Sequence, residues 1–129
     1  MRIAIIGSPR AGKTTLAKRL GEQLHLPVVH SDDLIPLGWS SSSSAVAGLI
    51  ELVAEQGGIF EGVAVVRALR KLLEETEGRP VDRVIVLAEP RLKLSPGQER
   101  MRLGCETMLR RITAELERRR VELTHGEPS

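Results

Sequence analysis

The sequence predicts one α/β domain, in which a small parallel sheet of about five strands lies between layers of helices. Three observations support this fold class. The length of 129 residues suits a single domain with a three-layer core. Short apolar runs alternate with segments of helical apolar spacing, as in strands joined by crossover helices. The first apolar run leads directly into a glycine-rich loop. We therefore expect residues 1–129 to form one domain, without room for a separate substrate domain.

The glycine-rich loop is the run GSPRAGKT, residues 7–14, which has the spacing G-x-x-x-x-G-K-[ST]. Its glycines let the backbone N–H groups point inward, its lysine reaches the β- and γ-phosphates of a nucleotide, and its hydroxyl ligates Mg²⁺. A strand precedes it and a helix follows, so the helix N-terminus adds its positive dipole. We predict a three-layer P-loop NTPase fold that binds ATP and Mg²⁺. The residues predicted to hold the nucleotide are Gly7, Ser8, Pro9, Arg10, Ala11, Gly12, Lys13, Thr14 and Thr15.

The strands are predicted from short apolar runs that end at turn or polar residues. They comprise residues 3–6, 27–30, 59–60, 83–88 and, more briefly, 121–123. Continuous apolar strands are typical of a parallel sheet that is covered on both faces. Right-handed crossovers then bring ligands to the carboxyl ends of these strands.

The helices are predicted from apolar residues that recur every three or four positions. The first three take their apolar faces from Leu16, Leu20 and Leu24, from residues 46–53 and from residues 65–73. The longest helix has the apolar positions Met101, Cys105, Met108, Leu109, Ile112 and Leu116. Its Cys105 is the only cysteine, and its place on the apolar stripe indicates a structural thiol rather than a nucleophile.

The remaining segments are predicted to be loops. The run PLGWSSSSSA, residues 36–45, combines proline, glycine and five serines, and its last serine suits a helix cap. A polar loop over residues 89–96 precedes the longest helix, and residues 124–129 are expected to fray.

Acidic residues follow three of the predicted strands. Asp32 and Asp33 come after the second strand, Glu61 after the third and Glu89 after the fourth. Because the carboxyl ends of parallel strands share one edge of the sheet, we expect these carboxylates near the phosphate loop. Glu61 suits a magnesium-bound water, although an ordinary strand-end acid is an equally simple interpretation.

The segments GSPRAGKTT, HSDDL and IFEG resemble the small P-loop kinases, which include nucleoside-monophosphate, shikimate, gluconate and polynucleotide kinases. The resemblance covers nearly the whole chain in its order of elements. The aspartate pair looks like the acceptor-side carboxylate of the polynucleotide-kinase-like members, in which the first aspartate deprotonates the hydroxyl. The resemblance thus gives this role to Asp32. One departure is that residues 34–36 lack the basic residue that the family has after the pair.

The chemistry of phosphoryl transfer supports the same assignment. The loop amides, Lys13 and Mg²⁺ supply charge stabilisation, and a kinase also needs a carboxylate near the acceptor hydroxyl. Since consecutive residues of an extended segment point apart, only one aspartate can face the γ-phosphate. We predict that Asp32 is the base and that Asp33 positions the acceptor or caps a helix. Simple capping by both residues is the alternative.

Four arginines are candidates for phosphate contacts. Arg67 and Arg70 follow Glu61 closely and are suited to grip an acceptor phosphate, or only to solvate their helix. Arg100 and Arg102 lie where related kinases carry a short lid with arginines that bind the transferring phosphate, and Arg91 is a weaker alternative there.

The sequence leaves the acceptor open between a nucleic acid and a small molecule. The formal net charge is only +2, but residues 91–120 hold nine basic and four acidic side chains. Such a basic helix suits a polyanion, or it is simply solvated. Trp39 is the only tryptophan and either stacks on a base or anchors the core. DNA or RNA ends, hydroxymethylated DNA bases, nucleotides, nucleosides and small metabolites all remain candidate acceptors.

An NTPase switch or motor and a nucleotide-binding protein without catalysis are the two other classes of function for such a loop. A GTPase switch lacks support because no N-K-x-D run is present, and a motor lacks it because the third strand ends in one acid followed by glycine. A nucleotide-binding protein without catalysis is disfavoured by the intact Lys13 and Asp32. With one cysteine and no membrane-spanning or leader-like apolar stretch, a cytoplasmic setting is the default expectation.

Overall fold

A computed structural model of the chain describes residues 1–32 and 39–126, and for residues 39–42 it describes the backbone alone. The strands along the chain are β1 (Arg2–Gly7), β2 (Val28–His30), β3 (Gly58–Glu61), β4 (Arg83–Leu87) and β5 (Glu122–His125). The helices are α1 (Lys13–Leu24), α2 (Trp39–Leu52), α3 (Val65–Glu75) and α4 (Pro96–Arg118).

The strands form one parallel sheet in the order β2-β3-β1-β4-β5. The central strand β1 pairs with β3 on one side and with β4 on the other. Its residues Ile3 to Ile6 are all buried, as a strand covered on both faces requires. The predicted five-stranded α/β fold is therefore confirmed.

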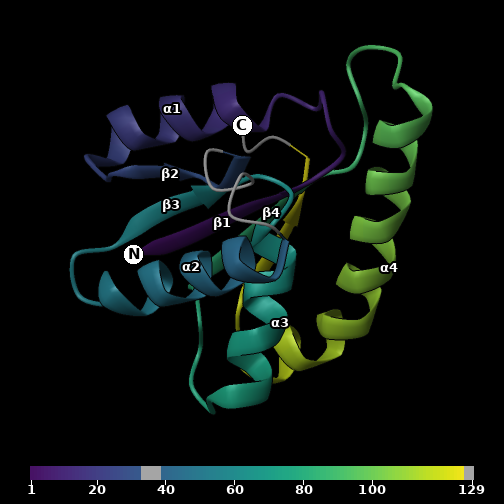
Figure 1. Cartoon of the computed structure of the whole chain (residues 1–129). Helices are drawn as coiled ribbons and strands as arrows, with labels where there is room; N and C mark the ends of the chain where they lie inside the picture. The colour runs from purple at the N-terminus through teal and green to yellow at the C-terminus, as the bar shows by residue number, and fades with distance from the viewer. Residues whose placement is uncertain (33–38, 127–129) are drawn as a thin grey trace.

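The two faces of the sheet carry unequal layers (Figure 1). Helix α1 covers one face, where Leu16 and Leu20 pack with Ile3, Ile5 and Ile85 in the smaller core cluster. Helices α2, α3 and α4 contribute to the larger cluster on the other face, which includes the fully buried Phe60. The phosphate loop joins β1 to α1 and so lies at the carboxyl edge of the sheet.

Two predicted boundaries are wrong. Residues 39–44 belong to α2, although their serines favoured a loop. Serine has a small intrinsic cost within a helix, and packing overrides it here, because Ser43, Val46 and Ile50 are buried. Thr124 and His125 extend β5 instead of fraying, since this strand pairs with β4 up to the Val86–His125 register.

Helix α4 is attached mainly through its C-terminal half. Its buried residues are Ile112 and Leu116, and neither lies in the first half of the helix. Just beyond its end, the Arg119 guanidinium donates to the backbone carbonyls of Leu73, Thr76 and Gly78 at 2.6, 2.7 and 3.0 Å. A capping box of Ser95 and Gln98 starts the helix. The N-terminal half is thus a stable helix that rests on few core contacts.

Candidate active site

The phosphate loop depends on two glycines. Gly7 has a φ of +143°, and a Cβ there would lie 2.0 Å from the Leu87 carbonyl oxygen. Gly12 has a φ of +88° and forms the N-cap of α1, another conformation that favours glycine. Next to Gly7, the Ser8 amide donates to the Leu87 carbonyl at 2.9 Å. The loop is therefore fixed against β4 by backbone contacts.

Lys13 folds back over this loop. Its ammonium donates to the carbonyls of Ser8 at 2.7 Å and Gly7 at 3.2 Å, and the side chain is only 8% exposed. Burial lowers its pKa, while the nearby Cys105, Glu61 and Asp32 act in the opposite direction. The lysine is thus in place to exchange carbonyl partners for phosphate oxygens when a nucleotide binds.

Glu61 connects the phosphate loop to β2. Its carboxylate, 2% exposed as a residue, accepts from the Thr14 hydroxyl at 3.2 Å and lies 2.6 Å from His30 Nδ1. Among residues 1–32 and 39–126, no cluster of three or more His, Cys, Asp or Glu side chains suits a metal. Thr14 and Glu61 do provide the oxygen ligands that Mg²⁺ prefers, and this ion usually keeps several waters and phosphate oxygens besides. The two residues therefore fit a magnesium ion that arrives with the nucleotide.

Asp32 faces the same cavity as Lys13 and Glu61. The cavity has a volume of about 300 Å³ and is lined by the loop, these three side chains, Val63 and Met101 among others. Strand β2 ends at His30, and Asp32 lies just beyond it in a short 3-10 turn instead of in extended backbone. The Asp32 carboxylate lies close to Gly62: a Cβ added to this glycine would be 3.0 Å from Asp32 Oδ1. Asp33 lies outside the described residues.

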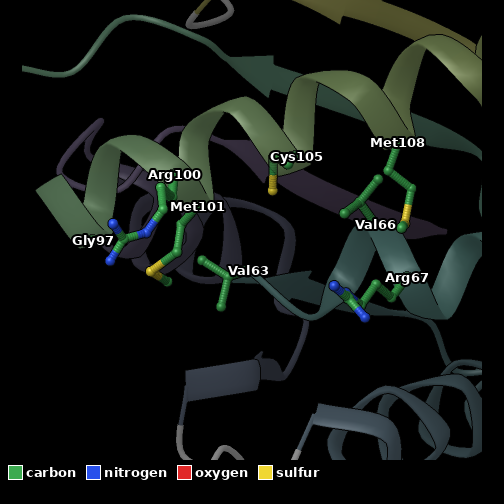
Figure 2. A pocket seen from close by; sticks show the side chains of 9 residues that line it. Val63, Val66, Arg67, Gly97, Arg100, Met101, Cys105 and Met108 are labelled. Atoms are coloured by element: carbon green, nitrogen blue, oxygen red, sulfur yellow. The ribbon is translucent and has the colours of Figure 1, made fainter.

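A second cavity, of about 280 Å³, lies between α3 and α4 (Figure 2). It shares Val63 and Met101 with the phosphate cavity, so the two are adjacent. Figure 2 shows mostly apolar and sulfur-containing side chains along it, with Arg67 and Arg100 toward opposite ends. The lining residues are Val63, Val66, Arg67, Gly97, Arg100, Met101, Gly104, Cys105 and Met108.

Cys105 behaves as a structural thiol at this place. It is partly buried, packs against the larger core cluster and lines the α3–α4 cavity. Burial raises its pKa, against the opposing effects of Lys13 and Arg67. A raised pKa disfavours the thiolate, which is the nucleophilic form, so a structural role for Cys105 stays the prediction.

The other predicted arginines lie in different surroundings. Arg70 pairs with Glu74 at 3.0 Å on the exposed side of α3. Arg102 pairs with Glu99 and Glu106 along α4, and it lines a small cavity near Gly7 and Ala88. Both guanidiniums therefore have carboxylate partners on their own helices.

Arg91 lies against the phosphate loop, although the sequence pattern favoured Arg100 and Arg102. Its guanidinium carbon would be 2.9 Å from a Cβ at Gly12, and its amide donates to the Arg10 carbonyl at 2.8 Å. The signal that identifies it is its position just after β4, the strand beside the loop. Of Trp39 the structure describes only the backbone, as the first residue of α2.

Three arginines of residues 91–120 form ion pairs with glutamates of the same segment. Arg118 and Arg119 both pair with Glu115, and Arg102 has its two glutamates. The pKa of Glu115 is lowered to about 2, mainly by the hydrogen bond from Arg118 and to a smaller extent by that from Arg119. The three glutamates are already counted among the four acidic residues of this segment, so its excess of basic side chains is unchanged.

Comparison with known proteins relates the chain to kinases. No family model matches it. An adenylate kinase from Streptomyces coelicolor is 34% identical over 117 residues, an alignment that covers 70% of this chain and 54% of the adenylate kinase. The chain thus spans about half the length of that relative.

The structural comparison concerns the fold. A shikimate kinase from Acinetobacter baumannii in complex with shikimate matches with a TM-score of 0.53 and 18% identity, covering 99% of this chain and 84% of that chain. No helix in the described part of the chain is both long and apolar enough to cross a membrane. The resemblance indicated by the GSPRAGKTT, HSDDL and IFEG segments is confirmed: the chain has the α/β P-loop fold of the small nucleotide and shikimate kinases and is similar in sequence to one of them.

Proposed function

We propose that this chain is an ATP-dependent kinase that transfers the γ-phosphoryl group to a hydroxyl of a nucleotide or other small acceptor. The observation that carries the proposal is the pair of adjacent cavities. One is lined by the phosphate loop, Lys13 and Asp32, and the other by α3 and α4. A kinase needs two such neighbouring sites, because the acceptor oxygen must meet the γ-phosphate in line.

The nucleotide side follows from the loop. Its backbone N–H groups and the N-terminus of α1 bind the phosphates. Lys13 neutralises charge that develops on the transferred group, and Thr14 and Glu61 hold Mg²⁺ directly or through water. When bound, the ion screens the phosphate charges and aligns the β- and γ-oxygens. Arg91, beside Gly12, is our candidate for a further contact to the nucleotide.

The acceptor side follows from Asp32 and the second cavity. Asp32 accepts the proton of the acceptor hydroxyl as the oxygen attacks the γ-phosphate, and ADP leaves. The volume of about 280 Å³ suits a compact molecule. Arg67 and Arg100 in a mainly apolar lining favour an acceptor that has an apolar body and an anionic group, such as a phosphate or carboxylate.

A nucleic-acid acceptor is the other possibility that the sequence left open. Three arginines of the 91–120 region pair with glutamates, and a solved structure that matches this chain, a shikimate kinase, holds the small molecule shikimate. We therefore favour the small acceptor, and we keep 5′-hydroxyl polynucleotides and hydroxymethylated DNA as arms of the test.

The experiment is a transfer assay with γ-labelled ATP and separate acceptor pools. The pools are nucleoside monophosphates, nucleosides, hydroxy acids and oligonucleotides with 5′-hydroxyl ends or hydroxymethyl bases. We expect label in a small anionic acceptor, and Lys13→Ala is the matched inactive control. If only oligonucleotides are labelled, and their apparent affinity falls steeply as salt rises, the acceptor is a polyanion and not a small molecule. Release of phosphate without any labelled acceptor would instead indicate an NTPase.

A further inference from the structure

The contact between His30 and Glu61 has no place in the sequence-based prediction of the site. The two residues are register partners at the carboxyl ends of β2 and β3. Since partners in a parallel pair point to the same face of the sheet, the imidazole and the carboxylate meet on the side of α1. Their contact, His30 Nδ1 to Glu61 Oε1, measures 2.6 Å. Glu61 is therefore held from a strand that is remote from the phosphate loop in the sequence.

The hydrogen bonds of Glu61 converge on one oxygen. Oε1 receives both the Thr14 hydroxyl, at 3.2 Å, and the shorter contact from His30. An ionised carboxylate can only accept, so the imidazole donates through Nδ1 and its tautomer is fixed by this bond. Because the side chain of Glu61 is only 3% exposed, little water is available to replace a lost donor. Of the two donors, His30 makes the closer contact with the carboxylate.

We propose that His30 is a positioning residue for the magnesium ion of the nucleotide complex. Its hydrogen bond holds the Glu61 carboxylate in the orientation in which this carboxylate and the Thr14 hydroxyl bind the ion or its waters. This inference rests on the proposed function, because it assumes that ATP binds with Mg²⁺ at this loop. Mg²⁺ demands near-ideal octahedral geometry, so an oxygen ligand that is free to rotate binds it or its waters less well. Donors that orient ligating carboxylates commonly change metal affinity by about 10–100-fold when they are removed.

The test compares nucleotide affinity with and without the metal. ATP binding to the wild-type chain is measured by titration calorimetry in excess Mg²⁺ and in EDTA, and thermal unfolding is measured on the same samples. His30→Phe keeps a ring but removes the donor. His30→Asn places an amide nitrogen near the position of Nδ1. His125→Phe, at the exposed end of β5, is the matched control.

We expect His30→Phe to reduce the advantage of Mg²⁺ in ATP affinity by about 10-fold or more. We expect His30→Asn to restore most of this advantage and His125→Phe to leave it unchanged. Titration of Mn²⁺ into the nucleotide complex, followed by electron paramagnetic resonance, should show the same order of metal affinities without any turnover.

Other outcomes overturn the proposal. If His30→Phe lowers the unfolding temperature but keeps the Mg²⁺ advantage, the residue has only a structural role. Equal loss in His30→Phe and His30→Asn would show that ring packing matters and the donor does not. A wild-type chain whose ATP affinity is independent of Mg²⁺ would refute the role of His30, while the kinase itself is judged separately by the transfer assay.

Discussion

The phosphate loop is formed by residues that are neighbours in the sequence, whereas the α3–α4 cavity is formed where two helices that are separate in the sequence meet. Gly7, Gly12 and the Ser8 amide fix the phosphate loop through backbone geometry and a bond to β4. The α3–α4 cavity depends instead on side chains from a helix half that has no fully buried residue. The difference teaches that the phosphate-binding motif is encoded locally and only held in place by β4, while the shape of the α3–α4 cavity depends on how α4 is attached.

The largest expected effect is on the phosphate side. Lys13→Ala removes the ammonium that faces the phosphates, so phosphoryl transfer should fall by about 10³–10⁵-fold, as when other enzymes lose a charge-stabilising cation. The unfolding temperature should change little, because the hydrogen bonds of the Lys13 ammonium within the described residues go to the loop carbonyls of Gly7 and Ser8. Transfer equal to that of the wild type would remove the loop from the mechanism.

The second-largest effect is expected from a substitution of Asp32, which lines the phosphate cavity. Asp32→Asn keeps the shape of the side chain but removes the base, so kcat should fall by about 10²–10⁴-fold. The affinity for ATP should stay close to that of the wild type, as measured by titration calorimetry. If Asp33→Asn produces this pattern and Asp32→Asn does not, the roles within the pair are exchanged.

A smaller effect should be confined to the acceptor side. Gly104 lines the α3–α4 cavity, and a Cβ there would meet no atom within 4 Å. Leucine is favoured over glycine in a helix, so Gly104→Leu should fold while it occupies part of the cavity. We expect the KM for the acceptor to rise by about 10-fold or more, with ATP affinity unchanged.

Gly48→Leu is the matched control, because Gly48 lies on the exposed side of α2 and also has open space around its Cβ position. It should leave both substrates unaffected. A parallel rise in acceptor KM for both variants would mean that the cavity is not the acceptor site.

The smallest effect concerns the attachment of α4. The pKa of Glu115 is lowered from 4.5 to about 2 by Arg118 and Arg119, so its carboxylate stabilises the folded state above about pH 4.5. This contribution is lost as the pH falls from 4.5 toward 2. Glu115→Gln should therefore be less stable than the wild type at pH 7, and the gap should narrow by pH 3. Denaturant unfolding at both values measures the gap, and a gap that widens in acid would contradict the assignment.

The same contrast explains what could be predicted from the sequence. The loop, β1 and α1 follow from local rules, because glycine spacing and apolar periodicity act over a few residues. Asp32 was recognised from its place after a strand, and it does line the phosphate cavity.

Other features depend on the order of strands in the sheet. His30 meets Glu61 only because β2 lies beside β3, an adjacency that no local pattern reveals. The position of Arg91 likewise depends on β4 lying beside β1. The helical serines of α2 were missed because burial of Val46 and Ile50 outweighs their local preference. Long-range pairing is thus the information that the sequence pattern lacks.

The central place of β1 has a consequence for biosynthesis. This strand is synthesised before both of its neighbours, β3 and β4, which comprise residues 58–61 and 83–87. Its apolar run must therefore stay unpaired until much of the chain has left the ribosome, which is typical of slow, non-local folding. The Ser8 amide also has no partner before Leu87 arrives. A nascent chain that stops short of β4 carries the complete phosphate-binding motif without the strand that holds it in shape.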